Sequence, residues 1–442
     1  MNYAQALEFI LSLPDMERFD SGPGSRVMSL ETMRSLLGRL HDPHRGRKTV
    51  HITGSKGKGS TSSFIASILS QAGVATGLYT SPHLGCYRER IAVNLRALSE
   101  EQFARGLETV RPAIEAEHAG GSGPVSTFGA MNALFFHSAR EHKADFQVVE
   151  VGLGGTYDGT NVFDLKEVAV VTAISLEHTA ILGDSPAKIA ANKAGIIVPG
   201  CLTVLARQRD PSVKAVIAER CAQVGSELVD VAQLYSWALL DHDRSGQTFV
   251  LRGPHGEQVL SLSMLGAHQL DNAVTAVAVV EALNKRQLPV TSEQIKRGLA
   301  TVRLPGRLEL ISMVPPVVVD GAHNGESMEN LCRALRLHFP AERYMFVLGV
   351  NADKDLGGML NHLSGMGRTI VCTRSGSARA LDPGQIAGEA RKVGLETIVS
   401  ESVAEAVDQA LRLRSADEVI CVTGSLHVAA EARAHVLAAC SS

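Results

Sequence analysis

Apolar residues recur along the chain with two different periods, and these periods predict most of its helices and strands. A short β-branched run at residues 49–53 reads as a buried strand that ends at Gly54, and an apolar-periodic helix follows from Ser60 and Thr61. The runs at 146–151 and 168–174 are almost continuously apolar, which is typical of strands covered on both faces of a parallel sheet. This alternation of strands and helices predicts an α/β fold with a doubly wound sheet.

The rest of the first 300 residues is predicted to contain further helices and one region with a different residue pattern. Helices are expected at the N-terminus and near residues 29–40, 99–117 and 131–142, and a further strand near 76–80. A polar segment at 19–26 is expected to be flexible. Between about 227 and 262, short alternating segments separated by glycine-containing turns predict a small antiparallel β element, followed by a helix over 271–284.

From residue 317 the alternation restarts and predicts a second, Rossmann-like unit. Its strands are expected at 317–320, 344–350, 369–373, 397–399 and 418–423, with helices between them. The segment Leu304-Pro-Gly-Arg307 lies between the two parts and is a candidate hinge. We therefore expect an N-terminal domain at residues 1–303 and a C-terminal domain at residues 304–442.

Composition excludes several classes of protein. The 442 residues carry 43 basic and 46 acidic side chains, so there is no overall charge bias toward nucleic acid or an anionic membrane. Aromatic residues make up only 4% of the chain, which also disfavours a base-stacking surface. Seven scattered cysteines without a CxxC pair indicate reduced thiols, neither a disulfide framework nor a zinc site. The N-terminus does not resemble a signal peptide, no apolar run is long enough to span a bilayer, and a cytoplasmic location is expected.

The stretch TVHITGSKGKGS at residues 49–60 has the context that a phosphate-binding loop needs. Glycines allow the backbone N–H groups to turn inward around an anion, and the N-terminus of the following helix adds partial positive charge. Lys58 can neutralise β- and γ-phosphates, and the hydroxyl of Ser60 can bind Mg²⁺. The spacing is unusual because Gly59 separates the lysine from the hydroxyl, and a surface turn rich in glycine and lysine is the alternative. We expect the loop to bind a nucleoside triphosphate.

Three further polar residues follow neighbouring strands, where α/β sheets place their ligands. Ser81 is a candidate metal ligand or a turn-capping serine, and Glu150 is a carboxylate in an apolar strand, a costly position unless it is paired or metal-bound. His178 alone would be an ordinary surface histidine, but together with Ser60, Ser81 and Glu150 it becomes a metal-ligand candidate. Lys193 lies at a helix end and could simply face the helix dipole. The glycines at 152–155 lack the spacing of a dinucleotide fingerprint, so NAD binding is not expected.

The second unit offers two loops with similar chemistry. In the first, Asp320 could accept a hydrogen bond from a ribose hydroxyl, and His323 and Asn324 could contact a ligand. In the second, the last strand runs into the sequence TGSLH, residues 423–427. Loops that faced the phosphate loop across a hinge would form a closing cleft.

Nine ordered blocks resemble the folylpolyglutamate synthase/dihydrofolate synthase family, within the Mur ligase superfamily of ATP-dependent amide-forming ligases. They are GSKGKGS, SPHL followed by RERIAVN, VEVGLGGTYDGTN, SLEHTAILG, NKAGII, HQLDNA, LPGR, DGAHN and TGSLH, and they cover the chain from about residue 20 to its end. The resemblance implies a P-loop Mur-ligase-like ATPase domain with a small β element, followed by a Rossmann-like domain. It also implies that ATP converts a carboxylate to an acyl phosphate, which the amine of L-glutamate then attacks.

The resemblance assigns roles to particular residues. It implies that ATP is bound by Gly54, Ser55, Lys56, Gly57, Lys58, Gly59, Ser60, Thr61, Asn272, Arg307 and Asp320. It implies that Mg²⁺, as one ion or two, is bound by Ser60, Ser81, Glu150 and His178. Lys193 occupies the position of the family's carbamylated lysine, and Lys58, His178 and Lys193 are the candidate catalytic residues. The substrate candidates are Arg90, Asp158, His323 and Ser425, although Arg88, Glu89 and Arg90 together read in part as a solvated face.

Two single residues and two segments depart from the family pattern. Lys56 replaces a common asparagine and adds a positive charge to the phosphate loop, and Gly325 replaces a proline, which should loosen its turn. The segments 20–26 and 126–129 both differ on the side that would bind the pterin ring. The expected substrates are a folate or pteroate and L-glutamate. The alternatives are a related ligase for another carboxylate, or a nucleotide-binding protein without catalysis. A monomer is the simpler expectation for the oligomeric state.

Overall fold

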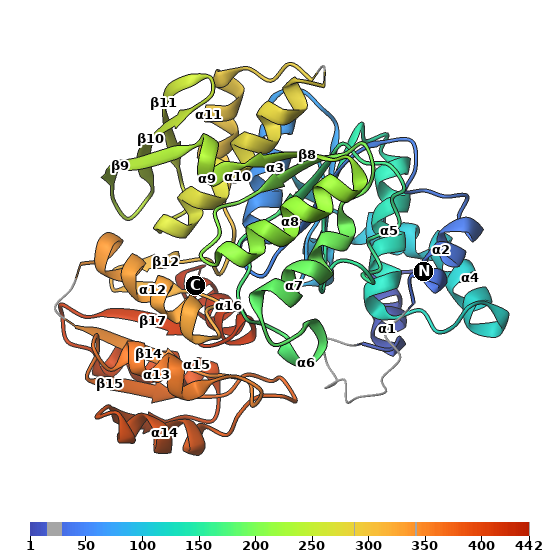
Figure 1. Ribbon diagram of the computed structural model, residues 1–442. Coiled ribbons are helices and arrows are strands. Elements are labelled where there is room, and N and C mark those ends of the chain that lie inside the picture. The colour runs from blue at the N-terminus through green and yellow to red at the C-terminus, as the bar shows by residue number, and fades with distance from the viewer. Residues whose placement is uncertain (16–28, 287, 341–342, 442) are drawn as a thin grey trace. The chain divides into compact units, whose positions relative to one another are not determined.

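A computed structural model describes residues 1–15, 29–286, 288–340 and 343–441 (Figure 1). The polar segment 19–26, which the sequence predicts to be flexible, lies outside these residues. The chain divides into two compact units. One unit comprises Met1–Ala238, Val250–Leu260 and Leu270–Val302, and the other comprises Leu239–Phe249, Ser261–Gln269 and Arg303–Ser442. Two segments before residue 303 thus belong to the second unit, and the simpler division into residues 1–303 and 304–442 stays a prediction.

The first unit contains an eight-stranded sheet in the order β4-β3-β2-β5-β1-β6-β7-β8. Its strands are β1 Lys48–Thr53, β2 Thr76–Tyr79, β3 Ile91–Val93, β4 Arg96–Ala97, β5 Phe146–Glu150, β6 Val168–Val171, β7 Leu202–Leu205 and β8 Glu227–Asp230. The six strands from β2 to β8 are parallel, which confirms the predicted α/β fold. Strands β3 and β4 form an antiparallel edge joined at Asn94 and Leu95, both with positive φ. This turn has the backbone of a type I′ hairpin but no glycine, so the sequence did not reveal it.

Helices surround this sheet (Figure 1). They are α1 Tyr3–Ser12, α2 Leu30–Arg39, α3 Lys58–Gln71, α4 Glu100–Gly120, α5 Thr127–Glu141, α6 Thr179–Leu182, α7 Pro186–Lys193, α8 Pro211–Val224, α9 Val231–Leu234, α10 Ala267–Asn284 and α11 Ser292–Thr301, with 3₁₀ turns η1 Tyr87–Arg90 and η2 Ala194–Ile196. Helix α3 packs on β2 and β5, and α8 packs on β7 and β8. Every residue of β5 and β6 is buried, which explains why both strands are largely apolar.

The predicted β element is present but begins later than expected. Strand β8 belongs to the large sheet, so the change in residue pattern at Glu227 does not mark the start of a new sheet. The separate three-stranded sheet has the order β11-β10-β9 and consists of β9 Ser236–His242, β10 Gln247–Gly253 and β11 Gly256–Leu262. Strand β9 was missed because most of its residues are exposed and it carries little apolar alternation.

The second unit contains a six-stranded sheet in the order β12-β13-β17-β14-β15-β16. Its elements are β12 Glu309–Met313, β13 Pro316–Val319, α12 Gly325–His338, β14 Tyr344–Leu348, α13 Leu356–Leu363, β15 Thr369–Cys372, α14 Pro383–Lys392, β16 Glu396–Val399, α15 Val403–Leu413, β17 Val419–Thr423 and α16 Leu426–Ser441. All five predicted strands are present and parallel to one another. The unpredicted strand β12 is antiparallel to β13 at the edge. No described helix combines the length and apolar character needed to cross a bilayer.

Helices α3 and α11 approach each other closely because Gly298 has no side chain. A β-carbon on Gly298 would lie 2.6 Å from the Cα atom of Ile68, and the Ser67 hydroxyl donates to the Gly298 carbonyl at 2.8 Å. Gly38, in helix α2 of the same unit, has open space at the corresponding position. Replacing either glycine with alanine changes helix propensity, but only the replacement at Gly298 disturbs close packing. A comparison of the two variants therefore isolates the effect of packing.

We expect Gly298→Ala to lower the free energy of unfolding by about 1–3 kcal/mol, because the methyl group must push the two helices apart. Gly38→Ala should instead leave stability unchanged or raise it by up to about 1 kcal/mol, because alanine restricts the unfolded chain. Denaturant unfolding of both variants measures the two effects. Equal stability of the two variants would contradict the packing argument.

Candidate active site

Four loops meet at the carboxyl edge of the first sheet. Strands β2, β5, β1 and β6 are neighbours in that order, and they lead into Ser81, Glu150, the phosphate loop and His178. The parallel register pairs Ile52 with Glu150 and Thr53 with Val171, so these strands end at nearly the same height. The structure therefore places the four predicted loops side by side, where open α/β sheets bind ligands.

The phosphate loop turns sharply and leads straight into helix α3. The N–H groups of Ser55 and Lys56 both donate to the Ala173 carbonyl, at 2.9 and 3.0 Å, which anchors the loop to the segment after β6. Gly57, with φ of 83°, precedes the helix, and no side chain caps the first turn. The helix begins at Lys58, two residues earlier than predicted. Its uncapped N–H groups and its dipole favour an anion at this end.

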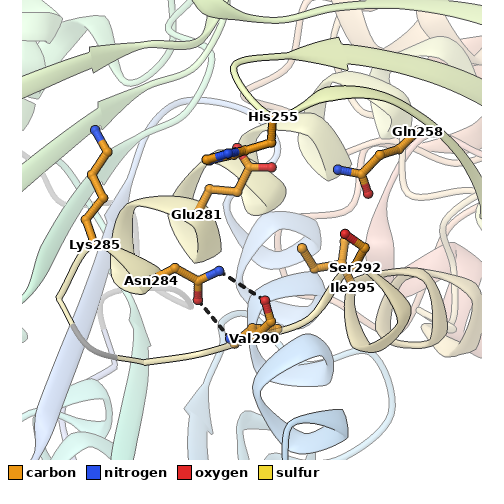
Figure 2. Close-up of a pocket in the computed structure, with 8 residues that line it drawn as sticks. All are labelled: His255, Gln258, Glu281, Asn284, Lys285, Val290, Ser292 and Ile295. Atoms are coloured by element: carbon orange, nitrogen blue, oxygen red, sulfur yellow. Dashed lines mark hydrogen bonds and ion pairs between the residues drawn. The ribbon is translucent and has the colours of Figure 1, made fainter.

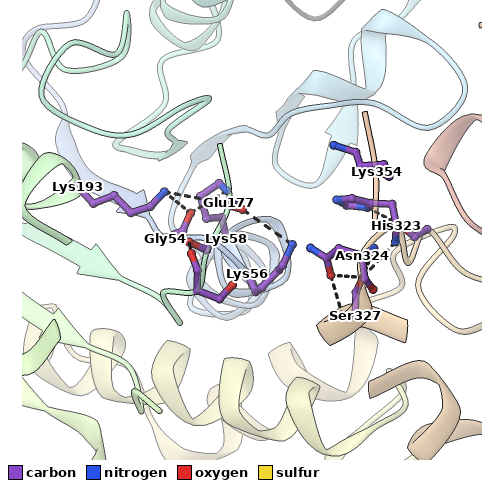
Figure 3. A network of polar contacts seen from close by, with 12 residues as sticks. Gly54, Lys56, Lys58, Glu177, Lys193, His323, Asn324, Ser327 and Lys354 are labelled. Carbon is purple, nitrogen blue, oxygen red and sulfur yellow. Dashed lines mark hydrogen bonds and ion pairs between the residues drawn. The ribbon is translucent and has the colours of Figure 1, made fainter. Parts of the chain in front are cut away.

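Three lysines gather around the Gly54 carbonyl and the carboxylate of Glu177 (Figure 3). The Nζ atoms of Lys58 and Lys193 donate to the Gly54 carbonyl at 3.0 and 2.9 Å. Lys193 also donates to Glu177 Oε1 at 3.3 Å, while Lys56 lies 3.9 Å from Glu177 Oε2. One carboxylate is thus shared among three cations, and the loop retains excess positive charge suited to a polyphosphate.

Burial and neighbouring charges shift the titration of this cluster. Burial, and next the charge of Lys58, lower the pKa of Lys193 to about 8, although Glu177 opposes the shift. Burial raises the pKa of Glu177, but Lys58, Lys193 and Lys56 outweigh it and hold that pKa below its usual value. Lys193 is only 1% exposed, so it is not a solvated cation facing the helix dipole. A substantial share of its amine is neutral near pH 8.

Glu150 is buried beside the phosphate loop and the loop after β2. Its Oε2 atom accepts a hydrogen bond from the Ser81 N–H at 3.1 Å, and a β-carbon on Gly59 would lie 3.4 Å from the same oxygen. Ser60, the next residue, is 7% exposed. The structure thus brings Glu150 close to the backbone on which both predicted hydroxyl ligands stand.

His178 and Arg90 differ from each other in exposure. His178 is exposed and has a left-handed backbone with φ of 46°, an uncommon conformation for a residue other than glycine. Arg90 is 2% exposed whereas Glu89 is exposed, so this segment is a solvated face only in part, as predicted. The Arg90 Nε atom donates to His83 Nδ1 at 2.9 Å and its guanidinium stacks over Tyr87, because η1 turns this side chain inward.

Two further predicted residues of the first unit lie close to these loops. A β-carbon on Gly57 would lie 2.1 Å from the Oδ1 atom of Asn272, so the Asn272 side chain rests directly on the phosphate loop. Asp158 is buried, and its Oδ2 atom accepts from the Leu153 N–H at 2.9 Å. Burial raises the pKa of Asp158, although its hydrogen bonds oppose the shift.

The remaining predicted residues lie in the second unit: Arg307 just before β12, Asp320 and His323 after β13, and Ser425 after β17. Asp320 joins two segments there, because its carboxylate accepts from the N–H groups of Leu308 and Ala322 at 2.8 Å each. Burial raises its pKa, against the charge of Arg307. His323 Nδ1 lies 2.9 Å from the Gly321 carbonyl, and the Ser425 hydroxyl accepts from the Val428 N–H at 3.1 Å at the start of α16.

Asn324 closes the turn that Gly325 was expected to loosen. Its Oδ1 atom accepts from the Ser327 N–H at 2.9 Å, and its own N–H donates to the Ser327 hydroxyl at 3.1 Å (Figure 3). These hydrogen bonds form a capping box at the start of α12. The cap therefore fixes the turn without proline.

Glu177 is the main site residue that sequence reasoning missed. It precedes His178 in the block SLEH, on a loop at a strand end, and this position was the available signal. Its importance depends on three lysines that lie 121, 119 and 16 residues from it in the chain. Only the fold brings these side chains together.

A separate hollow in the first unit, of about 330 Å³, lies near the turn between β10 and β11 and helices α10 and α11 (Figure 2). Glu281 accepts from the Tyr235 hydroxyl at 2.6 Å and lies 3.7 Å from His255 Nε2. The Asn284 amide exchanges two hydrogen bonds with the Val290 backbone, at 3.0 and 2.9 Å. These polar groups satisfy one another, and none of the predicted site residues lines this hollow.

The fold and the site define a Mur-type ligase. The Mur ligase middle domain matches residues 126–280, and the Mur ligase glutamate ligase domain matches residues 306–426. A solved structure of Mycobacterium tuberculosis folylpolyglutamate synthase complexed with ADP superposes with a TM-score of 0.88 at 30% identity, covering 98% of each chain.

Two relatives narrow this class further. A dihydrofolate synthase/folylpolyglutamate synthase of Bacillus subtilis is 31% identical over 413 residues, which cover 91% of this chain and 94% of the relative. A probable bifunctional folylpolyglutamate synthase/dihydropteroate synthase of Halobacterium salinarum is 34% identical over 438 residues, and this chain spans 51% of its length. The chain belongs to the folylpolyglutamate synthase/dihydrofolate synthase family.

The lowered pKa of Lys193 predicts a pH dependence of stability. The unfolded lysine keeps its proton up to pH about 10.5, whereas the folded one loses it near pH 8, so the unfolded state binds more protons between these values. The contribution of Lys193 to the unfolding free energy should therefore rise by about 2 kcal/mol from pH 8 to pH 10. Denaturant unfolding of the wild type and Lys193→Met, in buffer freed of carbon dioxide, isolates this contribution. Parallel curves for the two proteins would contradict the assigned shift.

Proposed function

We propose that this protein is an ATP-dependent ligase that adds L-glutamate to a folate, and also to dihydropteroate, through an acyl phosphate. The family to which the chain belongs supports the reaction class. The observation that carries the proposal is the lysine cluster at the start of α3, where Lys56, Lys58 and Lys193 surround one carbonyl and one carboxylate.

The residues of the phosphate loop supply what phosphoryl transfer requires. A carboxylate is a poor acylating agent, and the γ-phosphoryl group of ATP activates it. Lys58 and the N–H groups of α3 stabilise negative charge on that group during transfer, and such preorganised charge is the main source of catalysis in this chemistry. Lys56 adds a third cation, held beside Glu177, and strengthens nucleotide binding. Asn272 of helix α10, whose side chain rests against the loop, positions the nucleotide.

Mg²⁺ fits the residues around Glu150. Hydroxyl and carboxylate oxygens are the donors that Mg²⁺ prefers, and a buried carboxylate beside the phosphate loop is costly without a cation. Among the described residues, no three His, Cys, Asp or Glu side chains form a metal cluster, but half of the proposed set consists of serine hydroxyls. Ser60, Ser81, Glu150 and His178 hold the ion, which neutralises charge on the phosphates when bound. Lys193 is partly neutral near pH 8, and only a neutral amine reacts with carbon dioxide to form a carbamate.

The proposal assigns the other candidate residues to the remaining substrates. Arg90 and Asp158 act on the side of the folate or pteroate, and His323 and Ser425 bind L-glutamate. Arg307 and Asp320 are the candidate nucleotide-binding residues of the second unit. The monomeric state, the cytoplasmic location, the hinge at 304–307 and the closing cleft stay predictions.

The test is phosphate release from ATP by the purified protein with Mg²⁺ and L-glutamate, with tetrahydrofolate or dihydropteroate in parallel reactions. We expect release with both acids, and formation of the glutamylated product by mass spectrometry. Lys58→Ala should lower kcat by about 1,000-fold or more without changing the circular dichroism spectrum, because the transferring phosphoryl group loses its main cation.

The outcomes separate the competing functions. Release with tetrahydrofolate alone would restrict the activity to polyglutamate synthesis. Release with another carboxylate only would mean that the altered segments at 20–26 and 126–129 serve a different acid. ATP binding without turnover on any acid would favour a catalytically silent nucleotide-binding protein, and full activity of Lys58→Ala would remove the phosphate-loop assignment.

Glu150→Gln tests the metal site. The amide keeps the size of the side chain but loses its charge, so half-maximal activity should require about tenfold more Mg²⁺. A titration of activity with Mg²⁺ measures the change. Glu115→Gln, on the exposed surface of α4, is the matched control and should titrate like the wild type. Superimposable curves for all three proteins would exclude Glu150 from the metal site.

A further inference from the structure

A buried lysine that no motif singles out lies at the centre of a hydrogen-bond network beneath the candidate site. Lys166 is 5% exposed, and its Nζ atom lies 2.9 Å from His51 Nδ1, 2.8 Å from the Ile196 carbonyl and 3.5 Å from Asn161 Oδ1. These three acceptors match the three donors of an ammonium group. They come from β1, from η2 and from the loop after Asp158.

The first branch of the network leads from Lys166 to Asp158. Burial lowers the pKa of Lys166 to about 7, so below that pH the group is mainly an ammonium, which can only donate. His51 then accepts at Nδ1 and carries its proton on Nε2. His51 Nε2 lies 2.8 Å from the Thr160 hydroxyl and donates to it. That hydroxyl has one proton, which it donates to Asp158 Oδ1. Each hydrogen bond fixes the direction of the next, and the sequence of donors ends on the carboxylate.

The direction of these hydrogen bonds is important because the residues that form them are buried. His51 and Thr160 are 0% exposed and Asp158 is 7% exposed, so water cannot replace a lost partner at His51 or Thr160. Burial raises the pKa of Asp158, and the hydrogen bonds from Thr160 oppose that shift. Burial and the charge of Lys166 hold the pKa of His51 well below its usual value, which keeps the imidazole neutral.

The second branch leads toward Lys193. Lys166 holds the Ile196 carbonyl directly, and Asn161 donates to the Gly195 carbonyl at 3.2 Å and to the Thr156 carbonyl at 3.3 Å. The Thr156 hydroxyl donates in turn to the Asn192 carbonyl at 2.7 Å. These hydrogen bonds hold the backbone carbonyls that precede and follow Lys193 in the chain.

We propose that Lys166, His51 and Thr160 are positioning residues, which hold the Asp158 carboxylate ionised and oriented toward the folate or pteroate substrate. The inference rests on the proposed function, because it takes Asp158 as a residue on the side of that substrate. It extends the site to residues that do not touch any substrate. Thr160 is the link that can be altered with the least change of volume.

The test compares Thr160→Val, which removes the hydroxyl at nearly constant volume, with Thr160→Ser, which keeps it. We expect Thr160→Val to raise KM for the folate about tenfold and to leave KM for ATP within twofold, because a hydrogen bond to a buried charged group is lost. Thr160→Ser should resemble the wild type. A steady-state KM for each substrate and a melting curve are measured for every variant.

The failure of this inference can be told apart from failure of the proposed function. A wild type without turnover on any folate or pteroate would overturn the proposed function and this inference with it. An active wild type with equal KM values for Thr160→Val and Thr160→Ser would overturn the inference alone. Parallel changes in both KM values that follow loss of thermal stability would assign Thr160 a merely structural role.

A spectroscopic measurement tests the donor direction without any substrate. In protein labelled with ¹⁵N-histidine, the His51 signals, assigned by their loss in His51→Gln, should report a neutral ring protonated at Nε2 at pH 6.5. Lys166→Met, which keeps the length of the side chain without its charge, should shift the Nδ1 signal of His51. A wild-type ring protonated at Nδ1 would overturn the proposed direction of the network.

Discussion

The Gly54 carbonyl and the Glu177 carboxylate hold three cations in one small volume, and the candidate site depends on this balance of charge. Two of the lysines donate to the same carbonyl oxygen, and like charges at such separation repel. One shared carboxylate offsets only part of that repulsion. An anion of several charges would complete the neutralisation, which gives the loop a physical reason to bind a polyphosphate.

The scaffold that maintains this cluster is the central part of the first sheet. Four neighbouring parallel strands end at one edge, and β1 carries both the phosphate loop and, three residues before Gly54, His51. The network from Lys166 ties that strand to Asp158 and to the turn after Lys193. Buried polar groups of this kind are costly unless every member is satisfied, so they specify one arrangement of the loops.

Much of the fold followed from the sequence because its elements have strong local signals. Largely apolar runs identified β5 and β6, and the strand, glycine turn, lysine and helix at 49–60 identified the phosphate loop. The elements that were missed have weak local signals. Strand β9 is largely exposed, and the hairpin of β3 and β4 turns at Asn94 and Leu95 without glycine. Strand β8 was predicted to belong to the small β element, because its pairing with the large sheet depends on residues distant in the chain.

The sequence by itself determined the kind of chemistry, since the lysine, hydroxyl, carboxylate and histidine of the candidate site each stand at the end of a recognisable strand or helix. Tertiary structure decided which charges share a partner. Glu177 gains its role from Lys56 and Lys58, more than a hundred residues away in the chain, and Arg90 is buried although its neighbours read as a solvated face. Burial and pairing depend on segments distant in sequence, so no local pattern records them.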